Sequence, residues 1–207
     1  MKFVGVGCPR SGTLWMAEVL RRCGLRVGHE TVFSEVGYRP ELWPEFDGEI
    51  SHAAAQVWDE VPADWPVLQV VRHPVAIIRS MVDLEALGFG SVKGAATHVV
   101  EWSRRCVEAV DRGHPFLRVN ADRFGVPELQ RTFRHVSFRE LDVGAAEVAL
   151  RLRRDYNSGV ERLPTFGLES TVTLEDVYET LGWHPLRFHV EALAAAWGYD
   201  YHEVPRV

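Results

Sequence analysis

The sequence predicts an α/β fold in which helices cover both faces of a central parallel sheet, giving three layers. Apolar runs typical of buried strands occur at residues 3–6, 67–71 and 115–119, and helical patterns follow the first two. Strands that alternate with helices in this way indicate a parallel sheet. The chain has 207 residues, of which 46% are hydrophobic, so a single domain over residues 1–207 is expected.

Composition argues against several classes of function. The net charge of -6 leaves no broad basic face for nucleic acid, and no apolar run approaches the length of a membrane span. The first strand begins close to Met1, which leaves no room for a signal peptide. Three scattered cysteines suit a reducing compartment, and nine histidines without an HExxH pattern do not suggest a metal site. A soluble, cytoplasmic protein with no metal, nucleic-acid or membrane partner is therefore expected.

The N-terminus is predicted to form a strand, a tight loop and a helix. A helix with apolar residues on one side is expected over residues 13–22, with Gly24 at its end. The loop at residues 7–13 reads GCPRSGT. Its glycines let backbone amides turn toward one point, and the helix N-terminus adds the positive end of its dipole. This combination predicts an anion-binding loop, most often for phosphate.

The loop differs from two common phosphate-binding patterns. A nucleoside triphosphatase loop places lysine directly after its second glycine, but here Gly12 is followed by Thr13. The only long cation in the loop is Arg10. A cysteine phosphatase would need arginine six positions after its nucleophile, where Leu14 stands, so Cys8 is interpreted as a small loop residue.

The next segments are predicted to bring further polar residues to the loop. Residues 25–27 suit a short second strand, and ligands of parallel sheets gather beyond the carboxyl ends of strands, so His29 and Glu30 are expected near the loop. Residues 31–66 are predicted to be a long loop with short helices, such as builds a lid or substrate wall. Its tryptophans are interpreted as local core, with a binding platform as the alternative. The acidic run at residues 45–49 is interpreted as a solvated face, and the alternative is that it favours a neutral or cationic acceptor over an anionic glycan.

A second informative stretch begins with the clearest central strand, residues 67–71. A helix is expected from Pro74 to Leu87. A magnesium-dependent nucleotidase would place aspartate at the end of this strand, but Arg72 stands there, which favours metal-free recognition of a phosphate. Ser80 lies eight residues later and could share that anion if it faces the sheet edge. The alternative is that Arg72 simply pairs with a surface carboxylate.

The remainder of the chain is predicted to be mainly helical. A helix is expected at residues 94–112, a strand at 115–119, and further helices at 127–133, 144–153, 173–181 and 186–197. Thr173 with Asp176 resembles a helix-capping box.

Together, the two stretches resemble sulfotransferases that use 3'-phosphoadenosine 5'-phosphosulfate (PAPS), a family with a P-loop nucleotide-binding fold. The family's 5'-phosphosulfate loop, roughly P-[KR]-[SA]-G-T-[TS]-W/L, is similar to residues 9–15, PRSGTLW. Its 3'-phosphate motif, an arginine at a strand end with proline two and serine eight positions on, is similar to residues 72–80, RHPVAIIRS. Farther on, only the run of helices and the ending AWGY at residues 196–199 resemble bacterial members, with residues 157–159 a candidate nucleotide contact.

The resemblance implies that PAPS is the sulfuryl donor and that it leaves as 3',5'-adenosine bisphosphate after transfer. It also implies that the reaction needs no metal ion. It implies nucleotide contacts from Pro9, Arg10, Ser11, Gly12, Thr13, Leu14, Trp15, Arg72 and Ser80. Trp15 would either stack on adenine or pack in the helix core. The sequence departs from the commonest form of the family pattern in two places. Arg10 replaces the usual lysine, as in many carbohydrate-directed and bacterial members, and Leu14 replaces a hydroxyl residue. Arginine keeps the charge but cannot donate a proton, so an electrostatic role is expected for Arg10.

The acceptor must lose a proton during transfer, and three residues could accept it. His52 lies 20 residues before Arg72, similar to the catalytic histidine of cytosolic members, and Glu30 is similar to the base of members with a glutamate after the second strand. His29 is the third candidate. The expected partner is a small-molecule or carbohydrate acceptor with a hydroxyl or amine.

Two other functions remain open at this stage. A P-loop kinase or other nucleotide phosphotransferase would require magnesium and a carboxylate where Arg72 stands. A non-catalytic nucleotide-binding protein on the same scaffold would keep the binding residues but lack turnover. The sequence predicts neither the identity of the acceptor nor the oligomeric state.

Overall fold

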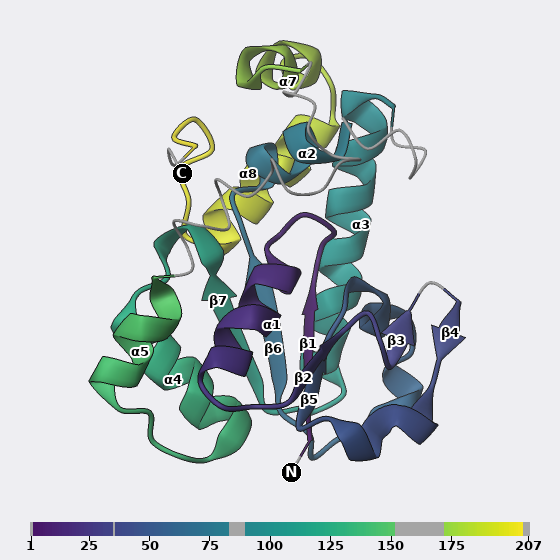
Figure 1. The fold of residues 1–207 in the computed structure, drawn as a ribbon. Coiled ribbons are helices and arrows are strands. Elements are labelled where there is room, and N and C mark those ends of the chain that lie inside the picture. The colour runs from purple at the N-terminus through teal and green to yellow at the C-terminus, as the bar shows by residue number, and fades with distance from the viewer. Residues whose placement is uncertain (1, 35, 83–89, 152–171, 205–207) are drawn as a thin grey trace.

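A computed structural model describes residues 2–34, 36–82, 90–151 and 172–204. Its centre is a five-stranded parallel sheet with the order β2-β5-β1-β6-β7 (Figure 1). The strands are β1 (Phe3–Gly7), β2 (Val27–His29), β5 (Gly48–Ile50), β6 (Val67–Val71) and β7 (Phe116–Asn120). The predicted α/β class, with a central parallel sheet flanked by helices, is confirmed.

The central strands are buried on both faces, as their apolar sequences predict. Every residue of β1 and β6 is buried. Phe3 belongs to one hydrophobic cluster and its neighbour Val4 to the other, because successive side chains of a strand point to opposite faces. The sheet therefore separates two cores.

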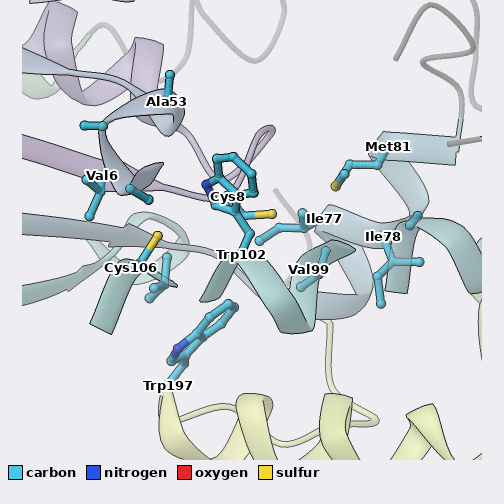
Figure 2. Packing of buried hydrophobic residues seen from close by; sticks show 14 of the residues in the cluster. Val6, Cys8, Ala53, Ile77, Ile78, Met81, Val99, Trp102, Cys106 and Trp197 are labelled. Atoms are coloured by element: carbon cyan, nitrogen blue, oxygen red, sulfur yellow. The ribbon is translucent and has the colours of Figure 1, made fainter. Parts of the chain in front are cut away.

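Helices supply the other side of each core. One cluster contains residues of α1 (Thr13–Arg22), α4 (Val126–Ser137) and α5 (Val143–Leu150). The second contains residues of α2 (Pro74–Val82), α3 (Val92–Asp111), α7 (Leu174–Leu181) and α8 (Leu186–Ala196). Figure 1 shows α1 and α3 on opposite sides of the sheet. Figure 2 shows part of the second cluster, which includes Val6 of β1 and side chains of α2 and α3. The capping box expected at Thr173 and Asp176 is present at the start of α7.

The segment 31–66 contains more regular structure than the sequence predicts. The short helices are present as the 3-10 helices η1 (Pro40–Glu45), η2 (His52–Gln56) and η3 (Trp58–Glu60). The prediction of an otherwise irregular loop is wrong, since the segment also holds β5 and a two-stranded hairpin of β3 (Phe33–Ser34) and β4 (Gly37–Tyr38). Trp43 and Trp58 are buried, in agreement with their interpretation as local core.

Strand β5 was not predicted from the sequence, because it is short and has an acidic residue in the middle. Its three residues read Gly48-Glu-Ile, yet they pair with both β1 and β2. A Cβ atom on Gly48 would lie 2.1 Å from Cε1 of Phe3, so glycine is needed where the two strands approach. Glu45 of this acidic run is exposed, as a solvated face would be, but Glu49 is fully buried, so the interpretation is wrong for Glu49.

Other boundaries differ by small amounts. The second strand is Val27–His29 rather than residues 25–27. The predicted extension of α2 from Val82 to Leu87 lies outside the described residues, as does the candidate contact at residues 157–159.

Candidate functional site

The candidate site lies where the carboxyl ends of β1 and β6 meet. These strands are neighbours, with Gly7 opposite Val70. The chain leaves β1 through α1 toward β2 on one side, and leaves β6 through α2 and α3 toward β7 on the other. In open α/β sheets, ligands bind in the crevice at such a change of direction.

The loop after β1 is held in a tight conformation. A Cβ atom on Gly7 would lie 2.6 Å from the carbonyl oxygen of Val70, so only glycine allows this approach. The Ser11 amide donates to the Cys8 carbonyl at 3.0 Å. Arg10 and Gly12 have positive φ angles of 70° and 98°. A left-handed arginine costs roughly 1–2 kcal/mol, and such strain is concentrated at functional sites.

Helix α1 begins directly at this loop with its first amides available. Gly12 provides no side-chain cap, and no acidic residue lies in the first turn. The first four N–H groups of a helix have no partner within the helix, and they carry the positive end of the dipole. The start of α1 thus has the chemistry of an anion-binding site.

Arg10 and Ser80 connect the two sequence motifs. Nε of Arg10 donates a hydrogen bond to Oγ of Ser80 at 2.9 Å, although the residues are 70 positions apart. Ser80 lies on α2, and its hydroxyl faces Arg10 of the loop after β1. The fold therefore places the loop after β1 beside the helix after β6.

Arg72 is held by a buried carboxylate. Its Nε donates to Oδ1 of Asp122 at 3.1 Å, and the Asp122 side chain is only 4% exposed. The amide of His73 donates to the other oxygen of Asp122 at 2.9 Å, and the Tyr199 hydroxyl donates to the same oxygen at 2.7 Å. Burial and the negative charge of Asp122 raise the pKa of Tyr199, which keeps its phenol protonated. Among the described residues, Arg72 uses only Nε for hydrogen bonding, so its two terminal nitrogens can contact a ligand.

Two of the three candidate bases form a pair. Nδ1 of His52 lies 2.7 Å from Oε1 of Glu30, with the His52 side chain 14% exposed and the Glu30 side chain 40% exposed. The hydrogen bond with His52 lowers the pKa of Glu30 below its ordinary value. The indole of Trp102 donates to the backbone carbonyl of His52 at 3.2 Å, which anchors the start of η2.

The third candidate, His29, contacts the anion loop. Its Nε2 lies 3.3 Å from Oγ1 of Thr13, the first residue of α1. Burial lowers the pKa of His29, and the charges of Arg21 and His52 lower it further against the opposing effect of Glu30. The His29 imidazole is therefore expected to be neutral near pH 7.

The remaining loop residues occupy varied positions. Ser11 and Thr13 are buried, Pro9 is partly buried and Leu14 is 38% exposed. The ring of Trp15 packs edge-on against Phe124 at 5.4 Å, and Trp15 lies against the cluster that contains α1.

Cys8 is buried among apolar side chains, as Figure 2 shows. Burial raises the pKa of its thiol well above the ordinary value, which disfavours the thiolate that a nucleophile requires. This environment agrees with its interpretation as a small loop residue.

Sequence reasoning missed three residues that support this site, namely Asp122, Tyr199 and Glu49. Asp122 follows β7 and so could have been placed at the same sheet edge by the rule that located Arg72. Tyr199 stands 77 positions from Asp122, and no pattern in the sequence indicates that the two meet. Glu49 was interpreted together with the rest of the acidic run at residues 45–49, and nothing in the sequence marks it as buried.

Comparisons with known proteins do not assign a family. A scan against protein-family models gives no match, and a search of curated proteins gives none either. Within the described ranges, no group of three or more histidine, cysteine, aspartate or glutamate side chains could hold a metal ion. In the same part of the chain, no helix combines the length and apolar character needed to cross a bilayer.

Proposed function

We propose that the protein is a PAPS-dependent sulfotransferase that moves a sulfuryl group to a hydroxyl or amine of a small-molecule or carbohydrate acceptor. The observation that carries the proposal is the hydrogen bond between Arg10 and Ser80. It joins one residue from each of the two sequence motifs that resemble this family. The site would be of the P-loop type, with the nucleotide across the carboxyl ends of β1 and β6.

Each motif has a separate task in this proposal. The amides of residues 12 and 13 and the guanidinium of Arg10 stabilise charge on the 5'-phosphosulfate as the bond to the leaving phosphate breaks, while the Ser11 amide stays bonded to Cys8 within the loop. One preorganised donor of this kind typically contributes a factor of about 100 to 1,000 in rate. Arg72 and Ser80 bind the 3'-phosphate, and Asp122 holds the Arg72 side chain in place.

The pairing of His52 with Glu30 suggests how the acceptor proton leaves. Glu30 accepts the Nδ1 proton of His52, which leaves Nε2 unprotonated and able to act as the base. Under this assignment Glu30 orients the base and stabilises the imidazolium that forms. Glu30 itself or His29 as the base are the alternatives, and His29 lies next to the start of α1.

The structure gives little support to the alternative function as a kinase. Asp122 does bring a carboxylate to the sheet edge just after β7. Both of its oxygens are already engaged, however, by Arg72, the His73 amide and Tyr199. A carboxylate bound in this way is poorly placed to hold a metal ion.

We further propose that the protein acts in the cytoplasm. All three cysteines are free, and Cys8 and Cys106 are buried. Free thiols suit the cytoplasm, where the donor PAPS would have to be supplied.

Calorimetric titration with two nucleotides tests the proposed function. Wild-type protein is expected to bind 3',5'-adenosine bisphosphate equally well with magnesium and with a chelator. An Arg10→Ala variant should bind it at least about tenfold more weakly, because a charge-assisted hydrogen-bond donor is lost. Arg22→Ala is the matched control, since Arg22 is an exposed arginine at the end of α1. Preference for magnesium-ATP would contradict the proposal and favour a kinase.

A further inference from the structure

A buried carboxyl group contacts the turn that carries Glu30. Glu49 of β5 is fully buried, and its Oε1 accepts a hydrogen bond from the Thr31 amide at 2.6 Å. Among the described residues, the other oxygen, Oε2, has no hydrogen-bond partner. The side chain is thus tied to the turn that carries Glu30.

The neighbouring strand is shaped to admit this carboxyl group. Gly28 of β2 stands opposite Glu49 in the sheet. A Cβ atom on Gly28 would lie 1.7 Å from Oε2 of Glu49, a distance that no side chain could tolerate. Glycine at this position therefore leaves the space in which the carboxyl group reaches the turn.

The turn itself has a strained conformation that needs support. Glu30 has a φ angle of 55°, in the left-handed region that is unfavourable for residues other than glycine. The hydrogen bond from Thr31 to Glu49 fixes the peptide group immediately after Glu30. Since that peptide sets the direction of the Glu30 side chain, the bond also fixes where Glu30 meets His52.

We propose that Glu49 is a positioning residue, which holds the strained turn so that Glu30 accepts the Nδ1 proton of His52. Its importance for turnover rests on the proposed function. Its geometric role does not rest on the proposed function, because the contact between Glu30 and His52 needs neither the sulfuryl donor nor the sulfuryl acceptor.

The electrostatic surroundings of Glu49 agree with a role as hydrogen-bond acceptor. Burial raises its pKa to about 7, while the amides of Thr31 and Val32 and the charge of Arg21 on α1 oppose this effect and Glu30 adds to it. A carboxyl group can accept the Thr31 amide bond whether or not it is protonated. A glutamine, which also has a side-chain carbonyl, should therefore replace it in this role.

Three substitutions at one position test the proposal. Glu49→Gln keeps the oxygen that accepts the Thr31 hydrogen bond, and Glu49→Ala removes it. Glu49→Asp shortens the side chain by one methylene, which moves this oxygen away from Thr31 with the least disturbance of packing. Long-range proton–nitrogen NMR spectra, recorded at about pH 8 where an ordinary imidazole is neutral, report which ring nitrogen of His52 carries the proton. The His52 signals are assigned by their absence in His52→Ala, and Glu30→Ala gives the spectrum of an unsupported His52.

The proposal predicts that wild type and Glu49→Gln protonate His52 at Nδ1. Glu49→Asp and Glu49→Ala should instead show the mixture of tautomers seen in Glu30→Ala, and their turnover should fall at least tenfold. If Glu49→Ala does not fold, Glu49→Asp alone decides the question. A wild-type spectrum in the folded Asp or Ala variant would overturn the role of Glu49. Absence of sulfuryl transfer in wild type would instead contradict the proposed function and leave the NMR test intact.

Discussion

At the scale of single residues, the contact between His52 and Glu30 decides how the candidate bases should be ranked. The Nδ1 to Oε1 distance of 2.7 Å makes them one unit rather than two independent bases. A base oriented by a carboxylate through its other ring nitrogen is a recurring arrangement in acyl and group transfer. The pair therefore favours His52 as the base and Glu30 as its partner.

Kinetics of two substitutions separate these roles. His52→Ala is expected to lower turnover roughly 100-fold or more with unchanged affinity for the bisphosphate, because only proton removal is lost. Glu30→Gln should cost less, since its side-chain carbonyl can still accept the Nδ1 proton. The measurement is sulfuryl transfer from PAPS to an acceptor found in a panel of phenols, sugars and amines. His189→Ala, at an exposed histidine of α8, is the control. A larger loss in Glu30→Gln than in His52→Ala would make Glu30 the base.

Glu49 gives a second prediction, which concerns stability rather than turnover. Its folded-state pKa of about 7 lies above the ordinary glutamate value of 4.5. Between these values the folded protein holds a proton that the unfolded chain releases, so the free energy of unfolding falls as pH rises. From this shift, the free energy of unfolding of Glu49→Gln relative to wild type is expected to increase by roughly 3 kcal/mol as the pH rises from 4.5 to 7.

Thermal or urea unfolding of both proteins at several pH values measures this gain. The difference between variant and wild type should be small near pH 4 and reach its full size above pH 7. A difference that does not change with pH would show that Glu49 titrates normally in the folded protein.

At the scale of elements, the strand, loop and helix at the N-terminus are largely determined by local sequence. Helix α1 has the predicted bounds of residues 13–22, and β6 has the predicted bounds of residues 67–71. Apolar runs, glycine turns and helix formers act over a few residues, and so they can be read from the sequence alone. The tight backbone geometry of the loop follows from the same local signals.

The meeting of Glu30 with His52 could not be predicted in this way. It depends on β5 lying beside β2, so that His29 pairs with Ile50 and the residues after both strands become neighbours. A three-residue strand containing a buried glutamate has no alternating pattern that would reveal it. The contacts of Asp122 with Arg72 and Tyr199 likewise depend on long-range packing of the C-terminal part against β7.

The conformation of the loop requires glycine at position 7, which can be tested by substitution. In a Gly7→Ala variant, the added methyl group would meet the Val70 carbonyl at 2.6 Å, and backbone cannot move aside as a flexible side chain can. The free energy of unfolding is expected to fall by about 1–3 kcal/mol, a usual cost of overpacking. Bisphosphate affinity should fall as well, because the loop is displaced.

Chemical denaturation and nucleotide titration check this prediction together. Gly90→Ala is the matched control, since a Cβ atom at Gly90 would meet no atom of the described residues within 4 Å. Equal effects of the two substitutions, or unchanged nucleotide affinity in Gly7→Ala, would show that the loop does not need its close contact with β6.

At the scale of the whole molecule, the fold concentrates positive charge locally in an acidic protein. The chain has a net charge of -6, yet Arg10 and Arg72 follow two adjacent parallel strands at the change of direction in the sheet. The start of α1 adds its dipole at the same place. In the proposed function, each of these arginines binds one of the two separate phosphate groups of the nucleotide.

The most direct test of this account is whether Arg72 distinguishes the nucleotides by their 3'-phosphate. Affinities for 3',5'-adenosine bisphosphate and for adenosine 5'-phosphate would be measured calorimetrically, without magnesium, for wild type and Arg72→Ala. Wild type is expected to prefer the bisphosphate by roughly 100-fold, as befits a charge-assisted contact worth a few kcal/mol. Arg72→Ala should lose most of that preference while retaining its affinity for the monophosphate. Equal affinities of wild type for the two nucleotides would contradict the assignment of the site.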